Sequence, residues 1–165
     1  MAVEDTITIT IDGRQVQGKK GQYLLEIARN AGFDIPGLCW HHKLSPTGAC
    51  RMCIVKVEGL RGFVASCATP AENGMVVTAF SDELEEERRF ILGSLMTEVE
   101  VGSDGSFKDE FATLAVRYGL LQNPDTPRPA AETNGLPKAR KTFRAIDESS
   151  PVLSFDPSRC IKCYR

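Results

Sequence analysis

Apolar and polar positions alternate strictly from residue 5 to residue 11, in the run DTITITI. Such alternation, with β-branched residues at most positions, is typical of a strand buried on one face. Asp12-Gly13 follows directly and favours a tight hairpin turn, so residues 14–19 are predicted to form the return strand. The period then changes. Apolar residues within 22–31 gather on one face of a helix, and a glycine and a proline shortly after this stretch end it.

Three short apolar runs come later, at residues 54–57, 63–65 and 75–80, with glycine-containing turns between them. Each is predicted to be a strand. Residues 37–52 follow no period and are expected to form an irregular loop. The order strand, strand, helix, loop and short strands predicts an α+β fold of the β-grasp type, in which one helix crosses a mixed sheet.

The second half of the chain has a different character. Residues 81–97 are predicted to form an amphipathic helix that begins at Ser81, a good N-cap. A shorter helix is expected over residues 109–120, and a surface connection rich in Pro, Asn, Thr and Ala follows it. The predicted organisation has four parts: a β-grasp domain at 1–80, a helical pair at 81–120, a linker at 121–150 and an extended C-terminal segment at 151–165.

Charge and hydropathy exclude several classes of protein. The formal net charge is −2, which gives no basic surface for a nucleic acid. No apolar run approaches the ~20 residues of a membrane span. The first ten residues, MAVEDTITIT, lack the pattern of a signal peptide. We therefore expect a cytoplasmic protein, in which closely spaced cysteines bind metal or do redox work more often than they form disulfides.

The cysteines carry the candidate chemistry. Four of the six have the spacing C-x(10)-C-x(2)-C-x(13)-C, and they are Cys39, Cys50, Cys53 and Cys67. A C-x(2)-C motif lets one tight loop direct two thiolates at one metal site, and soft thiolates select iron–sulfur clusters, zinc or copper(I). No constellation of catalytic acid, base or nucleophile accompanies them.

The spacing alone leaves more than one metal open. A [2Fe–2S] cluster suits a long loop that carries three ligands with a fourth on a later strand. Four cysteines also hold structural zinc, although a zinc site usually pairs two nearby C-x(2)-C motifs, and the second one here, Cys160 with Cys163, is distant. A Rieske centre needs two histidines in separate motifs, whereas His41 and His42 are adjacent. A structural zinc adaptor is the alternative hypothesis.

The runs PGLCWHHKLSPTGACRMCIVKVEG and VASCATPAENGMVV closely resemble the N-terminal [2Fe–2S] domain of the large iron–sulfur subunit of complex I. Similar domains occur in the small diaphorase subunit of NAD-reducing hydrogenases, in NAD-dependent formate dehydrogenase alpha subunits and in iron-only hydrogenases. The resemblance implies that Cys39, Cys50, Cys53 and Cys67 are the cluster ligands. It also implies an electron-transfer module of a larger NAD-linked oxidoreductase, whose partners are a flavin- or NAD-binding subunit and a catalytic centre.

Two further segments bear on this resemblance. FDPSRCIKCYR resembles the start of the family's ferredoxin-like segment, so Cys160 and Cys163 would be part of a [4Fe–4S] motif that is incomplete, and empty, in this chain. Further [4Fe–4S] clusters are expected only in a longer parent protein, of which this chain would be a fragment. The family usually holds another [4Fe–4S] cluster through one histidine and three cysteines after the first long helix. Residues 97–120 contain neither residue type, so that cluster is predicted to be absent.

Overall fold

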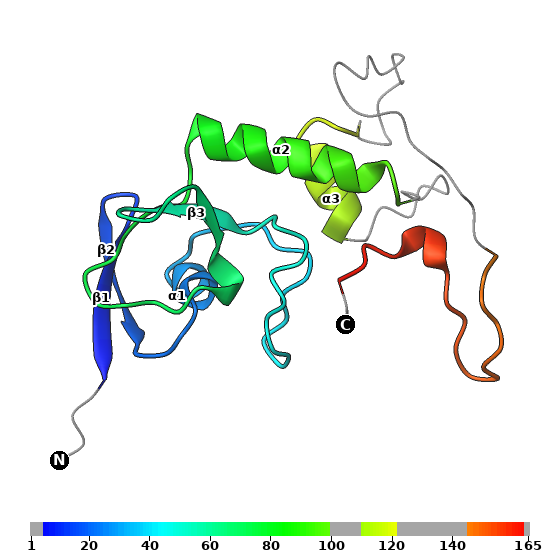
Figure 1. Cartoon of the computed structure of the whole chain (residues 1–165), viewed down its shortest axis with the longest axis horizontal. Helices are drawn as coiled ribbons and strands as arrows, with labels where there is room; N and C mark the ends of the chain where they lie inside the picture. Colours follow the sequence, from blue (N-terminus) through cyan, green and yellow to red (C-terminus); the bar gives the residue numbers. More distant parts are fainter. Residues whose placement is uncertain (1–4, 100–109, 122–144, 164–165) are drawn as a thin grey trace. The chain divides into compact units, whose positions relative to one another are not determined.

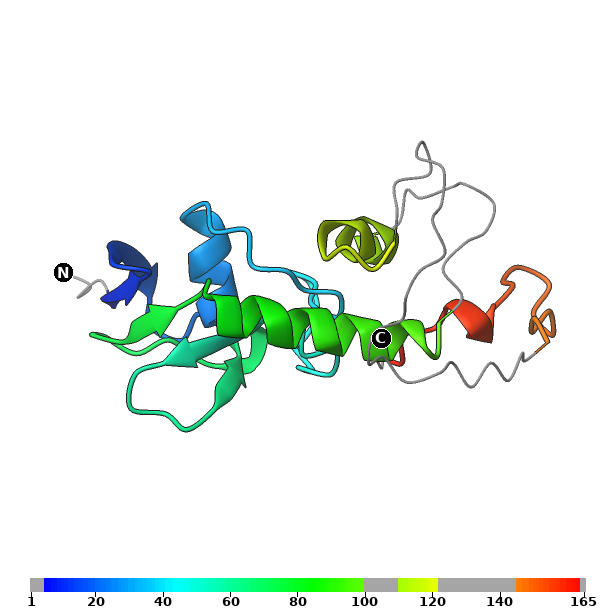
Figure 2. The same cartoon turned by 90° about the horizontal axis from the view of Figure 1, so that it is seen from above.

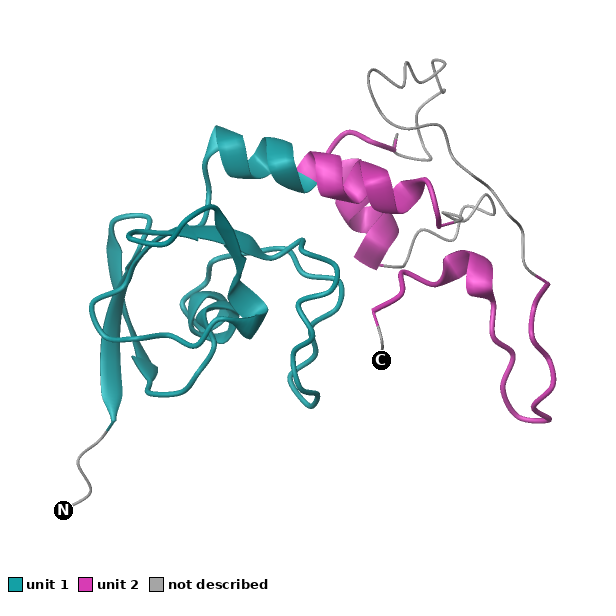
Figure 3. Ribbon diagram, in the orientation of Figure 1, with its two compact units in different colours: residues 1–88, 164–165 teal, residues 89–163 magenta. Residues whose placement is uncertain are grey.

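The computed structural model describes residues 5–99, 110–121 and 145–163. Two compact units are present, one within residues 1–88 and one within residues 89–163 (Figure 3). The predicted linker falls largely on residues 122–144, which lie outside the described residues, as do residues 100–109 of the predicted helical pair. Within the described residues, no helix is long and apolar enough to cross a membrane.

The first unit contains a mixed sheet of five strands in the order β2-β1-β5-β3-β4 (Figure 1). The strands are β1 (Thr6–Ile11), β2 (Arg14–Lys19), β3 (Ile54–Val57), β4 (Phe63–Ala65) and β5 (Val76–Thr78). Strand β1 is antiparallel to β2 and parallel to β5, and β3 is antiparallel to both β4 and β5. The predicted α+β class with a mixed sheet is therefore confirmed.

Helix α1 (Leu24–Asn30) covers one face of this sheet (Figure 1, Figure 2). The alternation in β1 buries Ile7, Ile9 and Ile11, and these pack in one core with the buried face of α1. The helix comes so near to β2 that a Cβ atom built on Gly18 would lie 2.3 Å from Cδ1 of Ile27. Glycine at this position therefore allows the close approach of helix and strand.

Helix α2 (Asp82–Met96) begins at the end of the first unit. The Ser81 hydroxyl accepts a hydrogen bond of 3.2 Å from the backbone N–H of Leu84, so the predicted cap is formed. Leu84 and Arg88 are fully buried, whereas Glu86 is exposed. Glu86, in the middle of the acidic run 85–87, is thus in contact with solvent. Arg88, the first of the two arginines that follow this run, is not.

The second unit holds the C-terminal part of α2 with helix α3 (Glu110–Arg117). Nε of Arg89 donates a hydrogen bond of 3.2 Å to the carbonyl oxygen of Tyr118, which joins the two helices. Further along the chain, Asp147 and Phe155 form an isolated antiparallel bridge. A 3-10 turn at Pro157–Arg159 then leads to Cys160.

Candidate metal centre

Four cysteine thiols come together at one end of the β3–β4 pair. Cys39 and Cys50 lie in the irregular loop between α1 and β3, and Cys53 immediately precedes β3. Cys67 lies in the 3-10 turn Ser66–Ala68 directly after β4. Ile54 of β3 pairs with Ala65 of β4, so this register brings Cys53 next to the turn that carries Cys67. All four side chains are buried, with at most 4% of their surface exposed.

The thiols form two hydrogen-bonded pairs. In one pair the Cys39 and Cys50 side chains hydrogen bond, and the backbone N–H of Cys50 donates to Sγ of Cys39 over 3.5 Å. In the other pair the Cys67 thiol hydrogen bonds to the Cys53 sulfur. The pairs lie within electrostatic reach of each other, because the sulfurs of Cys39 and Cys50 both act on the ionisation of Cys67.

Within the first pair the two thiols differ in acidity. Burial acts to raise the pKa of Cys39, but hydrogen bonds from the backbone and side chain of Cys50, with smaller ones from Thr47 and Ala49, outweigh it and lower the pKa. Burial raises the pKa of Cys50 to about 11, and the hydrogen bond to the Cys39 sulfur adds to this effect. Cys39 is thus the more acidic thiol of this pair and Cys50 the less acidic one.

The second pair repeats this arrangement. The hydrogen bond from the Cys67 thiol lowers the pKa of Cys53 to about 6 in spite of its burial. The pKa of Cys67 is raised, first by its hydrogen bond to Cys53 and then by burial and the charge of the neighbouring sulfurs. Each pair therefore contains one thiol that is more acidic than the other, and a bound cation favours deprotonation of both.

Backbone geometry in the C-x(2)-C loop is unusual. Arg51 has a positive φ of 59°, although it is not glycine, and its Nη2 donates a hydrogen bond of 3.2 Å to the carbonyl oxygen of Phe63. Gly48 has a φ of 64°, and a Cβ atom built on it would lie 3.5 Å from Cβ of Ala68. The loop is therefore held against β4 and the 3-10 turn by a side chain as well as by small residues.

Two residues that support the site escaped sequence reasoning. Ser66 is fully buried, and its hydroxyl donates a hydrogen bond of 2.6 Å to the carbonyl oxygen of Cys53. Arg51 holds the loop against β4 through the carbonyl group of Phe63. Ser66 directly precedes a cysteine in the sequence, which is a usable signal for a residue that supports a ligand. A positive φ at an arginine leaves no signal in the sequence.

The thiols are arranged as two adjacent pairs. All six cysteines lie within the described residues, and none of them forms a disulfide. In that part of the chain, no three Cys, His, Asp or Glu side chains converge on a point where a single ion would sit. A structural zinc site needs four ligands around one point, whereas a binuclear iron–sulfur cluster needs two thiolates on each iron. Two adjacent thiol pairs fit the second requirement.

The other candidate ligands lie elsewhere. His41 and His42 are exposed, and their rings stack on each other with centroids 4.4 Å apart. The two histidines are therefore exposed loop residues that contact each other. Cys160 and Cys163 lie in the second unit and are half-buried, and the backbone N–H of Lys162 donates to Sγ of Cys160 over 3.4 Å. The predicted incomplete [4Fe–4S] motif stays a prediction.

A β-grasp sheet with a loop of four buried thiols beside it defines a ferredoxin-like iron–sulfur domain. Residues 4–82 match the family model described as the 2Fe-2S iron-sulfur cluster binding domain, and the cofactor that goes with this match is a [2Fe–2S] cluster. The resemblance found in the sequence is confirmed.

Similar proteins extend this likeness over nearly the whole chain. An NADH-quinone oxidoreductase subunit of Streptomyces coelicolor is 47% identical over 163 residues, covering 98% of this chain and 18% of that protein. The NADPH-Fe(3+) oxidoreductase subunit alpha of Geobacter sulfurreducens is 32% identical over 169 residues, covering 96% of this chain and 18% of that protein. The crystal structure of an NAD+-reducing [NiFe]-hydrogenase in its H2-reduced state gives a TM-score of 0.79 at 34% identity, covering 95% of this chain and 62% of that chain. The chain thus spans 18% of the length of each of these two curated relatives.

Proposed function

We propose that this chain is an electron-transfer module in which Cys39, Cys50, Cys53 and Cys67 hold one [2Fe–2S] cluster. The observation that carries the ligand set is the formation of two adjacent buried thiol pairs, Cys39 with Cys50 and Cys53 with Cys67. In this proposal each pair binds one iron. One thiol of each pair has a lowered pKa, and binding of iron releases the thiol protons.

The cluster supplies one-electron redox chemistry, and the chain sets the conditions for it. Burial of the four sulfurs excludes water and lowers the local dielectric. The backbone N–H of Cys50, which donates to the Cys39 sulfur, reduces the electron density on that ligand. Hydrogen bonds to cluster sulfurs and limited solvent exposure are two of the factors that determine a cluster's reduction potential.

The relay role belongs to a larger assembly. The similar proteins are named as subunits of NADH-quinone and NADPH-Fe(3+) oxidoreductases, and the structural neighbour is an NAD+-reducing hydrogenase. We infer that this module passes electrons between a flavin- or NAD-binding subunit and a catalytic centre of an NAD-linked oxidoreductase. The four clustered thiols, which form no disulfide, suit a reducing, cytoplasmic setting.

Metal analysis of the anaerobically purified chain tests the proposal. We expect roughly two irons and two sulfides per chain, with a single half-spin EPR signal after reduction by dithionite. The Cys39→Ser and Cys67→Ser variants should each lose the cluster, because each removes one member of a different thiol pair. Bound zinc with no sulfide and no EPR signal would instead establish the structural zinc site. Retention of a full cluster in either variant would remove that cysteine from the ligand set.

A further inference from the structure

Helix α2 places a fully buried cation in the first unit. Arg88 has 0% of its surface exposed and is the largest of the fully buried side chains among the described residues. Burial of a charge is costly unless the charge is paired and hydrogen-bonded. In the sequence this residue stands in the strongly charged run EEERR, which is typical of a solvated helix face. Its burial therefore needs a structural or functional reason.

The guanidinium contacts backbone as well as a carboxylate. Nη2 of Arg88 donates hydrogen bonds of 2.6 Å to the carbonyl oxygen of Ile54 and 2.8 Å to that of Ala79. Nη1 donates a hydrogen bond of 2.6 Å to Oε1 of Glu85, which is also its ion-pair partner. The Phe80 ring lies beside it, with its centroid 5.4 Å from the guanidinium carbon.

These contacts lie where two strands separate. Strands β3 and β5 are antiparallel, and Val57 pairs with Val77 and Lys56 with Thr78. Among the described residues, Lys56 and Thr78 are the last pair of these two strands in the direction of Ile54. The carbonyl groups of Ile54 and Ala79 lie beyond this last pair, and Arg88 joins them. Ile54 directly follows Cys53 in the chain. The guanidinium is therefore hydrogen-bonded one peptide unit away from a proposed cluster ligand.

The negative partner of Arg88 is more exposed than Arg88 itself. The Glu85 side chain has 37% of its surface exposed, against 0% for Arg88. Water therefore screens the charge of the carboxylate more strongly than that of the guanidinium. The two charges do not cancel each other fully at the buried guanidinium. A net positive charge therefore remains beside the carbonyl groups of Ile54 and Ala79.

We propose that Arg88 is a positioning residue that fixes the Ile54–Val55 peptide, one peptide unit away from Cys53, and raises the reduction potential of the cluster. This proposal rests on the proposed function. Reduction adds one electron, here supplied by dithionite, and leaves the four-thiolate site one charge unit more negative. A fixed cation close to the site in a medium of low dielectric constant favours this change. Arg88 thus makes the site easier to reduce.

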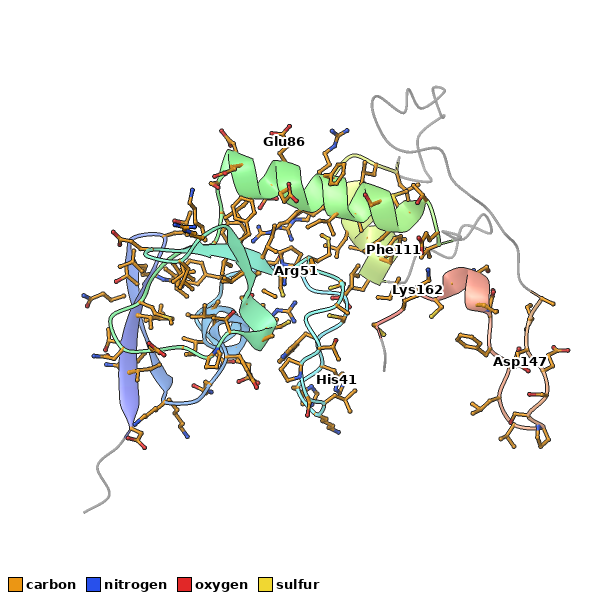
Figure 4. The ribbon with its side chains drawn as sticks, viewed as in Figure 1. His41, Arg51, Glu86, Phe111, Asp147 and Lys162 are labelled. Carbon is orange, nitrogen blue, oxygen red and sulfur yellow. The ribbon has the colours of Figure 1, made fainter. Side chains whose placement is uncertain are left out.

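A pair of glutamate variants separates this electrostatic role from a structural one. Glu85→Gln removes the negative charge that faces Arg88, and Glu86→Gln removes the same charge from the adjacent, exposed position. Figure 4 shows Glu86 on the side of α2 that faces away from β3. In a redox titration followed by EPR, Glu85→Gln should raise the potential clearly more than Glu86→Gln does. Equal shifts in the two variants would overturn the proposal.

Replacement of Arg88 itself should shift the reduction potential in the opposite direction. Arg88→Gln should lower the equilibrium constant for reduction about tenfold, which is 59 mV for one electron. Arg88→Lys keeps the positive charge but not the hydrogen bonds from one nitrogen to two carbonyl groups. Its reduction potential should therefore stay close to that of the wild type, whereas its melting temperature should fall. An Arg88→Gln chain with full iron and sulfide and an unchanged potential would contradict the proposal. Absence of iron and sulfide from the wild-type chain would instead disprove the proposed function.

Discussion

The Ser66 hydroxyl donates a hydrogen bond of 2.6 Å to the carbonyl oxygen of Cys53, and the backbone N–H of Ser66 donates to the same oxygen over 3.0 Å. One carbonyl next to a proposed ligand is thereby held by the residue that precedes Cys67, another proposed ligand. This contact joins the start of β3 to the turn after β4. These two segments carry Cys53 and Cys67, the members of the second thiol pair.

Ser66→Ala removes one of these two hydrogen bonds. Because the backbone N–H still satisfies the Cys53 oxygen, we expect a loss of about 1 kcal/mol in the free energy of unfolding. Urea denaturation followed by circular dichroism measures this change. Ser45→Ala, at an exposed position of the cysteine loop, serves as the control and should stay within about 0.5 kcal/mol of the wild type. An equal effect of the two variants would show that the Ser66 hydroxyl does not stabilise the fold.

Cys53→Ser should abolish the cluster or destabilise it severely. Its thiol has the lowered pKa of the second pair, and serine supplies no comparable soft anionic ligand. The visible absorption spectrum and the iron content measure the outcome. Cys160→Ser is the matched control, because Cys160 lies in the other unit, and it should leave both quantities unchanged. An intact spectrum in Cys53→Ser would exclude this residue as a ligand.

Gly18→Ala tests the close approach of α1 to β2. The new methyl group would lie 2.3 Å from Cδ1 and 2.7 Å from Cγ1 of the buried Ile27, so we expect a loss of about 1–3 kcal/mol in the free energy of unfolding. Ile27→Val, which removes Cδ1, should restore part of this loss in the double variant. A double-variant cycle in thermal or urea denaturation measures the coupling. Purely additive effects would contradict the steric explanation.

Arg29→Ala should loosen the segment that leads to Cys39. Nη2 of Arg29 donates a hydrogen bond of 3.0 Å to the carbonyl oxygen of Ile35, and its guanidinium carbon lies 5.1 Å from the ring centroid of Trp40. We expect a loss of about 1–2 kcal/mol in stability. Trp40 is the single tryptophan of the chain, so its fluorescence emission should shift to longer wavelength as water reaches the ring.

Arg61→Ala is the matched control for Arg29→Ala, because Arg61 is exposed in the turn between β3 and β4. It should change neither the emission of Trp40 nor the free energy of unfolding by more than about 0.5 kcal/mol. If both variants left the emission where it is in the wild type, Arg29 would have no role in holding the loop.

Much of the first unit followed from local patterns. The alternation in residues 5–11 and the Asp12-Gly13 turn predicted the hairpin of β1 and β2, and the change of period predicted α1. The four clustered cysteines were recognised from their spacing. Their division into two hydrogen-bonded pairs was not, because it depends on the register of β3 against β4 and on the path of the loop.

Arg88 shows why other features could not be predicted. Periodicity places a charged residue of an amphipathic helix in solvent, since the pattern contains no information about unpaired carbonyl groups on a neighbouring sheet. The acceptors, Ile54 and Ala79, come from strands far apart in the sequence. Only the tertiary arrangement supplies the carbonyl groups that accept hydrogen bonds from the buried guanidinium.

The position of β5 in the middle of the sheet has a consequence for the order of assembly. The hairpin of β1 and β2 and the pair of β3 and β4 are joined only through β5, which is the last of the five strands along the chain. A nascent polypeptide that ends just after Cys67 already carries all four clustered thiols, yet its sheet is still in two halves. The two halves can therefore pair into one sheet only after residues 76–78 have left the ribosome.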